Sequence, residues 1–371
     1  MKRILSFLGV LLYLLTVISA PKTVTLTAAV TEDRDFGAAY IDLTPAAFEA
    51  AGFTLGDSVD LVFDNGFALE DVPYYNGYNA RTGKPLICAY PSYPHPAVSF
   101  CSGEPLWEAA GLREGNTVTV TLREKGRYLS VHEAMNLVYD NDPAAYPSRE
   151  AFANFRAMTG GALAENKFYR GASPVNNAMS RAPVTDALLE ETGIRFVLDL
   201  ADTEEKLAGF RAAADYASDY FDGLYAEGNV ALLGLNASFR GERFMKTLAE
   251  GLRVMTAHEG PVYIHCLEGK DRTGFVCALL EALAGADYDE LREDYMATYR
   301  NYYGITREDR PEPYAAVLSV KFEDIVQLLT GLPDGSDYSG DVLKNAAADY
   351  LLDCGMTEAE IEALTAYLCG E

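Results

Sequence analysis

Val262 to Gly274 reads VYIHCLEGKDRTG and predicts a strand, a tight loop and a helix. The β-branched and aromatic run Val262 to Ile264 is typical of a short strand, and Phe275 to Leu283 is apolar enough for a buried helix. Five residues separate Cys266 from Arg272, enough for a loop whose backbone N–H groups surround a tetrahedral oxyanion, with the positive end of the following helix behind it. The pattern therefore predicts an anion-binding loop with a cysteine at its base.

Cys266 is the candidate nucleophile of this loop. The inward N–H groups, the helix terminus and Arg272 all favour the thiolate over the thiol. The planar guanidinium of Arg272 can bind two oxygens of a phosphoryl group at once, which a lysine cannot match. Thr273 is placed to donate a hydroxyl hydrogen bond to the sulfur, which would make the sulfur a better leaving group. The remaining candidate phosphate-binding residues are Leu267, Glu268, Gly269 and Lys270.

The pattern His-Cys, five residues, Arg-Thr-Gly, from His265 to Gly274, resembles the phosphate loop of cysteine-dependent protein-tyrosine phosphatases. Its inner part, Gly269 to Thr273, resembles in particular the bacterial tyrosine and phosphoinositide phosphatases whose loop reads Gly-Lys-Asp-Arg-Thr. A structural cysteine before a charged helix is the alternative reading. A nucleotide-binding P-loop fits less well, because Lys270 is followed by Asp271 rather than by Ser or Thr. The resemblance implies hydrolysis of phosphate monoesters through a phosphocysteine, without a cofactor.

Monoester hydrolysis also needs an acid that protonates the leaving oxygen and a base that activates water. Many tyrosine phosphatases keep this Asp on a mobile loop before the Cys, but Leu233 to Ser238 contains no carboxylate here. The resemblance makes Asp271 the leading candidate, with a structural role in bonding loop amides as its alternative. Asp199 and Asp202, at the end of a neighbouring predicted strand, are the second choice. We expect His265 to order the loop backbone.

The overall charge limits the partners of the chain. It has 371 residues, 49% of them apolar, and a formal net charge of -25. Nucleic acids and anionic membrane surfaces would be repelled at long range, so a phosphate substrate must be attracted locally, by Lys270, Arg272 and the loop amides. The four His residues are scattered and no Cys-x-x-Cys occurs, so we expect no metal site.

The N-terminus has the composition of a targeting segment. Met1-Lys2-Arg3 precedes a mostly apolar run from Ile4 to Ala20. This pattern predicts an export signal or a membrane anchor over residues 1–21, and a protein that works outside the cytoplasm, secreted or membrane-anchored. A buried globular helix is the alternative.

Residues 22–128 predict a small β-barrel or sandwich that serves as an accessory domain. Short strands, separated by turns rich in Gly and Pro, are expected at 23–30, 39–43, 58–63, 85–88, 97–100 and 116–122. The pattern formed by 33–37, 55–57, 72–75 and 110–115 resembles the C-terminal β-barrel domain of S-adenosylmethionine hydroxide adenosyltransferases. The aromatic residues here, Tyr78 among them, fit either a groove or a core. Cys88 and Cys101 could form a disulfide if the domain is exported.

Residues 129–371 predict the phosphatase-like domain, with a parallel central sheet flanked by helices. Helices are expected at 184–192, 203–225 and 242–258, and strands at 195–200 and 230–235. This alternation favours a parallel sheet with the loop at the carboxyl end of a central strand. Arg170 either reaches the site or forms an ordinary ion pair. Further helices at 313–329, 342–352 and 357–368 are expected to flank or cover the sheet, and Cys354 and Cys369 are too far apart along them to pair.

Two functions of different classes fit these patterns. The first is an exported phosphomonoesterase that acts on phosphotyrosine or, alternatively, on inositol phosphates and phosphoinositides. The second is a phosphate-binding or adhesion scaffold. The presence of both Cys266 and Arg272 favours the enzyme. Lys270 suits a second phosphate on the substrate, whereas Glu268 would repel one.

Overall fold

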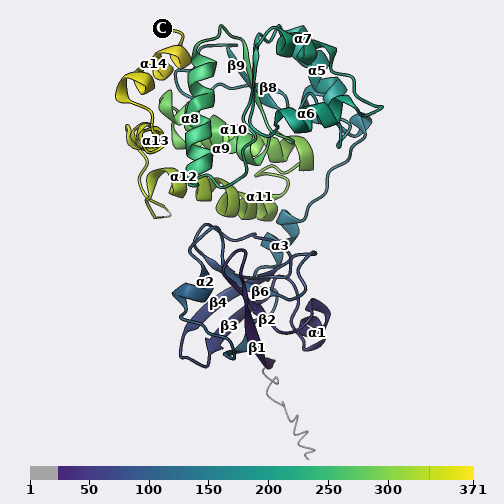
Figure 1. Ribbon diagram of the computed structural model, residues 1–371, viewed down its shortest axis with the longest axis vertical. Coiled ribbons are helices and arrows are strands. Elements are labelled where there is room, and N and C mark those ends of the chain that lie inside the picture. Colours follow the sequence, from purple (N-terminus) through teal and green to yellow (C-terminus); the bar gives the residue numbers. More distant parts are fainter. Residues whose placement is uncertain (1–23, 334) are drawn as a thin grey trace, which may run out of the picture.

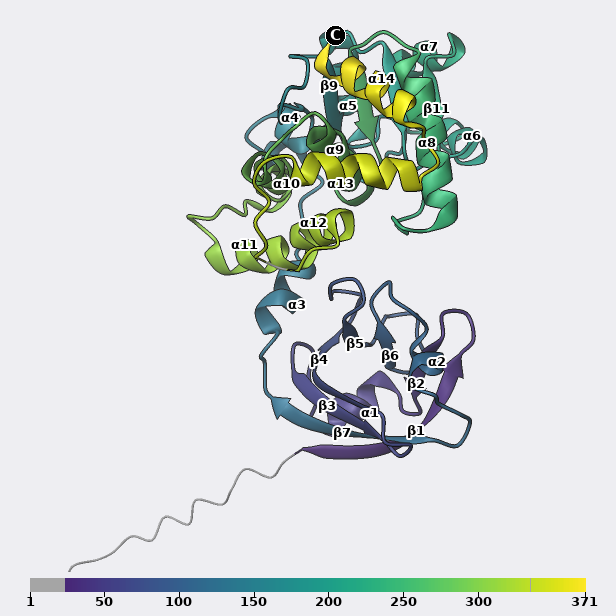
Figure 2. The same ribbon diagram turned by 90° about the vertical axis from the view of Figure 1, so that its left-hand side faces the viewer.

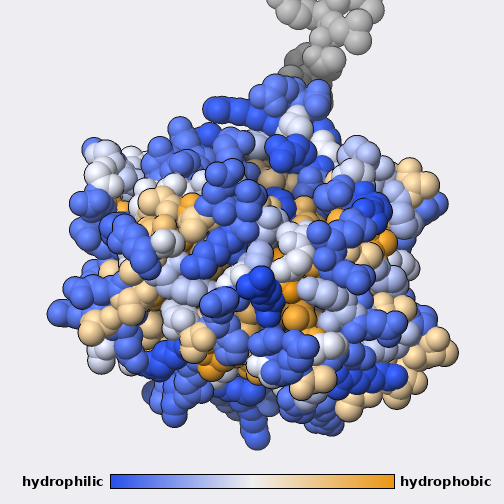
Figure 3. All heavy atoms as spheres, turned by 90° about the horizontal axis from the view of Figure 1, so that it is seen from above, coloured by the Kyte–Doolittle hydropathy of each residue, from blue (hydrophilic) through white to orange (hydrophobic). Residues whose placement is uncertain are grey.

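The computed structural model describes residues 24–333 and 335–371, which form a barrel domain followed by an α/β domain (Figures 1 and 2). The predicted targeting segment, residues 1–21, lies outside this range. Within the described residues, no helix combines the length and the apolar character that a membrane crossing requires. The face of the molecule in Figure 3 is mostly hydrophilic, with apolar side chains in small, scattered groups.

The N-terminal domain is a closed barrel with the strand order β1-β2-β6-β5-β4-β3-β7. All neighbouring pairs are antiparallel except β4 and β5, which are parallel. Apolar side chains at alternating strand positions form the core of the barrel, and side chains from two short helices pack with them. The elements are β1 (Thr25–Asp33), β2 (Ala38–Ile41), α1 (Pro45–Ala50), β3 (Ser58–Phe63), β4 (Ala68–Tyr75), β5 (Pro85–Cys88), β6 (Ala97–Phe100), α2 (Leu106–Ala109) and β7 (Thr117–Glu124).

The disulfide considered between Cys88 and Cys101 is not formed. Both thiols are free and buried. Cys88 lies opposite Ala97 in the β5–β6 ladder, whereas the Cys101 N–H bonds the carbonyl of Lys84, four residues back along β5. Lys84, opposite Cys101, is four residues from Cys88, and each residue of a strand rises about 3.3 Å. The backbones of Cys88 and Cys101 are therefore roughly 13 Å apart, which is too far for a disulfide.

The chain passes from the barrel to the second domain through α3 (Leu129–Met135), which packs on α11 (Pro311–Val317). The 3-10 turn η1 (Pro143–Ala145) and the short helix α4 (Arg149–Phe152) follow.

The second domain contains a five-stranded sheet in the order β11-β10-β12-β9-β8. The pairs β11–β10, β10–β12 and β12–β9 are parallel, as expected, and the edge strand β8 is antiparallel to β9. The strand that precedes Cys266, β12, is the central one. The strands are β8 (Arg156–Ala157), β9 (Phe168–Gly171), β10 (Phe196–Asp199), β11 (Val230–Leu232) and β12 (Val262–His265).

Helices cover the sheet, and α9 lies at the centre of the domain (Figure 1). Every residue of α9 from Thr273 to Leu283 is buried. The helices are α5 (Ala182–Thr192), α6 (Glu204–Arg211), α7 (Asp219–Ala226), α8 (Glu242–Thr256), α9 (Asp271–Leu283), α10 (Tyr288–Tyr303), α11, the π-helix η2 (Leu318–Phe322), α12 (Glu323–Thr330), α13 (Val342–Asp353) and α14 (Glu358–Cys369).

Two predicted helices are interrupted. The helix expected over 203–225 is split into α6 and α7, because the carboxylate of Asp186 on α5 accepts the backbone N–H groups of Tyr220 and Phe221 and fixes a new helix start there. The helix expected over 313–329 contains the π-helix η2, which separates α11 from α12.

Candidate active site

The loop from Cys266 to Lys270 joins the carboxyl end of β12 to the start of α9. Cys266 is 3% exposed and packs with the main hydrophobic core. Gly269 has a φ of +67° and turns the chain toward the helix. The loop therefore lies at the carboxyl end of the central strand, where open α/β sheets bind their ligands.

The carbonyl groups of the loop face away from the site. The carbonyl of Leu267 accepts the Ser173 N–H at 3.0 Å, and that of Glu268 accepts the Tyr302 hydroxyl at 2.6 Å. The carbonyl of Gly269 accepts the Asn154 amide at 3.2 Å and the Arg170 guanidinium at 3.1 Å. Because the N–H and C=O of a trans peptide point in opposite directions, the N–H groups of these peptides point away from the groups that bond the carbonyls.

These N–H groups are left for a ligand. Within the described part of the chain, the backbone N–H groups of 267–270 donate to no acceptor. The first N–H groups of α9 lie next to them, and a helix leaves these without intrahelical partners. Together they gather unpaired donors at the positive end of a buried helix, an arrangement suited to a phosphate.

Arg272 and Thr273 occupy the first turn of α9. Arg272 Nη1 donates to the carbonyl of Leu235, in the loop after β11, at 2.9 Å. This bond fixes the direction of the side chain through a neutral partner. Among residues 24–333 and 335–371, no carboxylate forms an ion pair with Arg272. Thr273 is fully buried, and its hydroxyl has no hydrogen-bond partner among the described residues.

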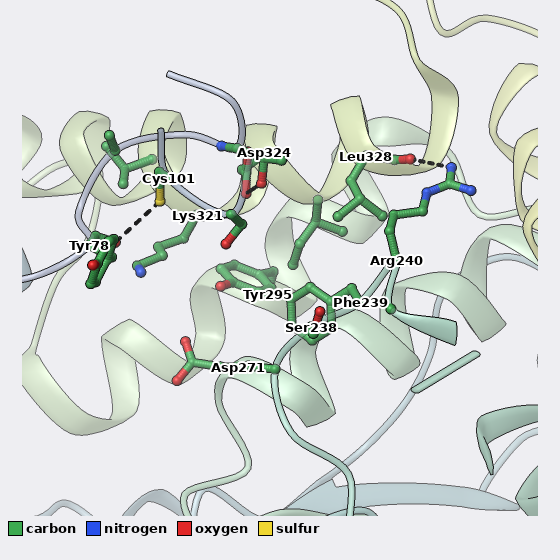
Figure 4. Close-up of a pocket in the computed structure, with 17 residues that line it drawn as sticks. Tyr78, Cys101, Ser238, Phe239, Arg240, Asp271, Tyr295, Lys321, Asp324 and Leu328 are labelled. Atoms are coloured by element: carbon green, nitrogen blue, oxygen red, sulfur yellow. Dashed lines mark hydrogen bonds between the residues drawn. The ribbon is translucent and has the colours of Figure 1, made fainter. Parts of the chain in front are cut away.

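Asp271, the first residue of α9, is more exposed than the nearby Glu268 and Lys270. Its side chain is 46% exposed and lies 4.0 Å from Lys270 Nζ. It lines a cavity of about 450 Å³ next to the loop (Figure 4). The predicted acid therefore faces open space where a substrate can lie.

Lys270 is occupied by the loop itself. Its ammonium group lies 3.0 Å from Glu268, which also accepts the Tyr139 hydroxyl. Burial opposes the charge, but Asp271 and Glu268 together raise the pKa of Lys270 above its ordinary value. A lysine already paired with Glu268 is less available to a second phosphate than the sequence suggested.

Asp199, Asp202 and His265 form a buried group behind the loop. His265 Nε2 lies 3.7 Å from Asp199 Oδ2, and His265 Nδ1 donates to the Cys266 carbonyl at 3.1 Å. Burial lowers the pKa of His265 to about 4 and raises the pKa of Asp199 to about 6. Burial and the neighbouring Asp199 raise the pKa of Asp202 to about 6. His265 is thus neutral at pH 7 and touches the loop backbone, whereas Asp199 is fully enclosed.

Arg170 supports the loop from behind instead of reaching the cavity. It forms an ion pair with Asp294 and donates to Gly269, and Asp294 also binds Arg156 at 2.8 Å. Asn154, Asp294 and Tyr302 were not predicted as site residues. The positive φ of Asn154, 52°, marks it as unusual, but no feature of the sequence indicates its contact with the loop.

The mostly parallel sheet, the cysteine before a loop of unpaired N–H groups and the following arginine are typical of a phosphatase-type hydrolase. Residues 149–370 match the tyrosine phosphatase family, and the chain belongs to that family. No curated protein matches the chain.

Two solved structures are similar to part of the chain. P. aeruginosa TpbA is 20% identical with a TM-score of 0.25, and the match covers 50% of this chain and 90% of that one. The core catalytic domain of the PP-IP phosphatase SIW14 from S. cerevisiae, in complex with citrate, is 14% identical with a TM-score of 0.26, covering 47% of this chain and 95% of that one.

Proposed function

We propose that this phosphatase hydrolyses phosphotyrosine through a phosphocysteine on Cys266. The observation that carries the proposal is the orientation of the loop: its carbonyls are bonded on the outer side and its N–H groups are left for an anion. Arg272 would bind the equatorial oxygens of the phosphoryl group. The same donors would stabilise the charge that develops on those oxygens in the transition state.

The first half of the reaction forms the intermediate. The Cys266 thiolate attacks phosphorus, an S–P bond forms and the bond from phosphorus to the leaving oxygen breaks. Asp271, as the general acid, gives its proton to that oxygen. The half-exposed position of Asp271 beside the cavity supports this role over that of the enclosed Asp199.

The second half releases phosphate. The Asp271 carboxylate takes a proton from water, the water oxygen attacks phosphorus, and the S–P bond breaks to return the thiolate. The free hydroxyl of Thr273 would donate to the departing sulfur and stabilise its negative charge. The products are inorganic phosphate and the dephosphorylated substrate.

The charges beside the loop favour phosphotyrosine over an inositol ring that carries several phosphates. Lys270 is paired with Glu268, and Asp271 lies next to both. Further phosphate dianions would meet two carboxylates here. Phosphoinositide hydrolysis is the alternative activity.

We also propose that the protein acts outside the cytoplasm, exported or membrane-anchored. The basic and apolar N-terminus alone supports this proposal.

Turnover of a phosphotyrosine peptide and of a phosphoinositide by the purified protein tests the proposal. We expect higher kcat/KM on the peptide, and no turnover by Cys266→Ser, which keeps the N–H groups and should still bind phosphate. Phosphate binding without turnover by the wild-type protein would instead favour the scaffold. Undiminished turnover by Cys266→Ser would exclude the phosphocysteine.

A further inference from the structure

The cavity beside Asp271 is built by both domains. Its barrel side includes Tyr78 and Cys101, and its phosphatase side includes Asp271, Tyr295 and Lys321 (Figure 4). Its volume of about 450 Å³ lies within the range of small-ligand sites. One continuous space therefore joins the proposed general acid to the accessory barrel.

The barrel is fixed to the phosphatase domain at the edge of this cavity. Thr82 donates to Asp324 twice, from its backbone N–H at 2.7 Å and from its hydroxyl at 3.0 Å. Both residues line the cavity. Beside them, Arg81 lies 3.9 Å from Glu323. These contacts hold the barrel against the start of α12 at the edge of the cavity.

If Asp271 is the acid, the leaving group lies at the edge of this space, because Asp271 is the phosphate-loop segment's residue among those that line it. The proton goes to the oxygen that leaves, so that oxygen lies beside the Asp271 carboxylate. The rest of the substrate then continues into the cavity that Asp271 lines. Apolar side chains such as Phe239, Ile325 and Leu328 line this space and can pack on an aromatic ring. Figure 4 shows Phe239 and Leu328 on one side of Asp271 and Tyr295, and Tyr78 on the other.

The cations of the cavity differ in availability. Arg240 binds Asp353 at 3.0 Å and the carbonyl of Leu328 at 2.6 Å. Lys321 stands on the π-helix η2 and makes no ion pair within residues 24–333 and 335–371. It acts electrostatically on the thiol of Cys101, which in turn contacts the carbonyl of Tyr78. Lys321 is therefore the available positive charge at the barrel end of the cavity, where the nearby Asp324 carboxylate is already bonded twice by Thr82.

We propose that the barrel is one wall of the substrate cleft, and that Tyr78 and Lys321 select polypeptides that carry an acidic residue beside phosphotyrosine. The proposal rests on the phosphatase function proposed above. The aromatic ring would lie on the apolar stretch, the neighbouring backbone against Tyr78 and the acidic side chain at Lys321. Because the chain as a whole is strongly negative, this local cation decides whether an acidic segment is accepted.

The test uses two substrates. One is a peptide in which an acidic residue stands next to phosphotyrosine, and the other is p-nitrophenyl phosphate, which is too small to reach the barrel. The quantity measured is the ratio of the two kcat/KM values. We expect Tyr78→Ala and Lys321→Glu each to lower this ratio by about tenfold, the loss expected for removed contacts in a specificity pocket. Tyr90→Ala is the matched control, an exposed barrel tyrosine (46%) that does not line the cavity, and it should leave the ratio unchanged.

A ratio within about twofold of wild type for both variants, far less than the tenfold loss expected, would overturn the proposal. If Tyr78→Ala fails to fold, the half-buried Lys321→Glu decides alone. For a peptide with a basic residue next to phosphotyrosine, Lys321→Glu should raise the kcat/KM ratio instead of lowering it. A loss of the ratio for both the acidic and the basic peptide would contradict the role of Lys321. Absence of p-nitrophenyl phosphate turnover by the wild-type protein would refute the phosphatase function itself, separately from the role of the barrel.

Discussion

The backbone of Gly269 passes so close to that of Gly171 that a Cβ on Gly269 would lie 2.2 Å from the Gly171 carbonyl oxygen. The obstacle is backbone at the end of β9 and cannot rotate away. Gly269 also has a φ of +67°, a conformation that costs other residues about 1–2 kcal/mol. The curvature of the phosphate loop therefore depends on a missing side chain.

We expect Gly269→Ala to lower the free energy of unfolding by at least about 2 kcal/mol, because strain and overlap add, and to abolish phosphatase activity. Gly285→Ala is the matched control, with a φ of +86° and no atom within 4 Å of the added Cβ. It should cost only about 1 kcal/mol and leave activity intact. Denaturant unfolding and initial rates of both variants check this, and equal effects would contradict it.

Thr273→Val should separate stability from activity. The hydroxyl is buried without a partner, so its isosteric replacement should leave the free energy of unfolding unchanged or raise it by up to about 1 kcal/mol. Breakdown of the phosphocysteine should slow, and the phosphoenzyme should accumulate after rapid acid quenching. Thr365→Val, on the outer helix α14, should affect neither breakdown nor accumulation. A large loss of stability in Thr273→Val would show that the hydroxyl has a structural partner.

Asp271→Asn should lower kcat by about a hundredfold or more on phosphotyrosine, the usual contribution of a general acid. The loss should be smaller on p-nitrophenyl phosphate, because its leaving oxygen needs less protonation. Rates over a series of aryl phosphates with different leaving groups measure this difference. Intact rates for Asp271→Asn, together with an inactive Asp199→Asn, would transfer the acid role to Asp199.

Glu281→Gln should stabilise the protein at high pH only. Burial raises the pKa of Glu281 well above its ordinary value, so the folded state holds a proton that the unfolded state releases above about pH 4.3. Folding must then take up a proton, and stability falls as the pH rises above that value. Each pH unit costs about 1.4 kcal/mol until the pH reaches the folded-state pKa.

Glutamine removes this cost, so Glu281→Gln should gain about 1–3 kcal/mol over wild type at pH 8 and little at pH 4.5. Denaturant unfolding at the two pH values measures the difference. Glu259→Gln, whose side chain is 88% exposed, is the control without a pH-dependent effect. The same gain at both pH values would mean that Glu281 is ionised in the folded protein.

Local patterns predicted much of the fold. The strands 58–63, 85–88 and 97–100 have the bounds expected from alternation and turn residues. Strand β4 was missed, because it contains Pro73, which is unfavourable in a regular strand. The φ of 56° at Asp71 shows a local irregularity that the sequence does not reveal. The break between α6 and α7 depends on Asp186, more than thirty residues earlier in the chain, so no local pattern reveals it.

In the site, too, the contiguous residues were predictable from the sequence and the distant ones were not. Cys266 to Thr273 is contiguous, so its spacing alone indicated a phosphate loop. The groups that hold its carbonyls come from three other segments, with Asn154 on the first, Arg170 and Ser173 on the second and Tyr302 on the third. Only the folded chain brings them together. Arg170 could not be assigned from the sequence, because an arginine at the end of a strand can face either side of the loop.

The burial of α9 from Thr273 to Leu283 affects how the enzyme fails on heating. The hydrogen-bonded amide protons of this stretch should exchange with solvent only when the α/β domain opens. Residual catalysis measured along a thermal ramp should thus follow the same curve as loss of tertiary structure, with no earlier inactivated form.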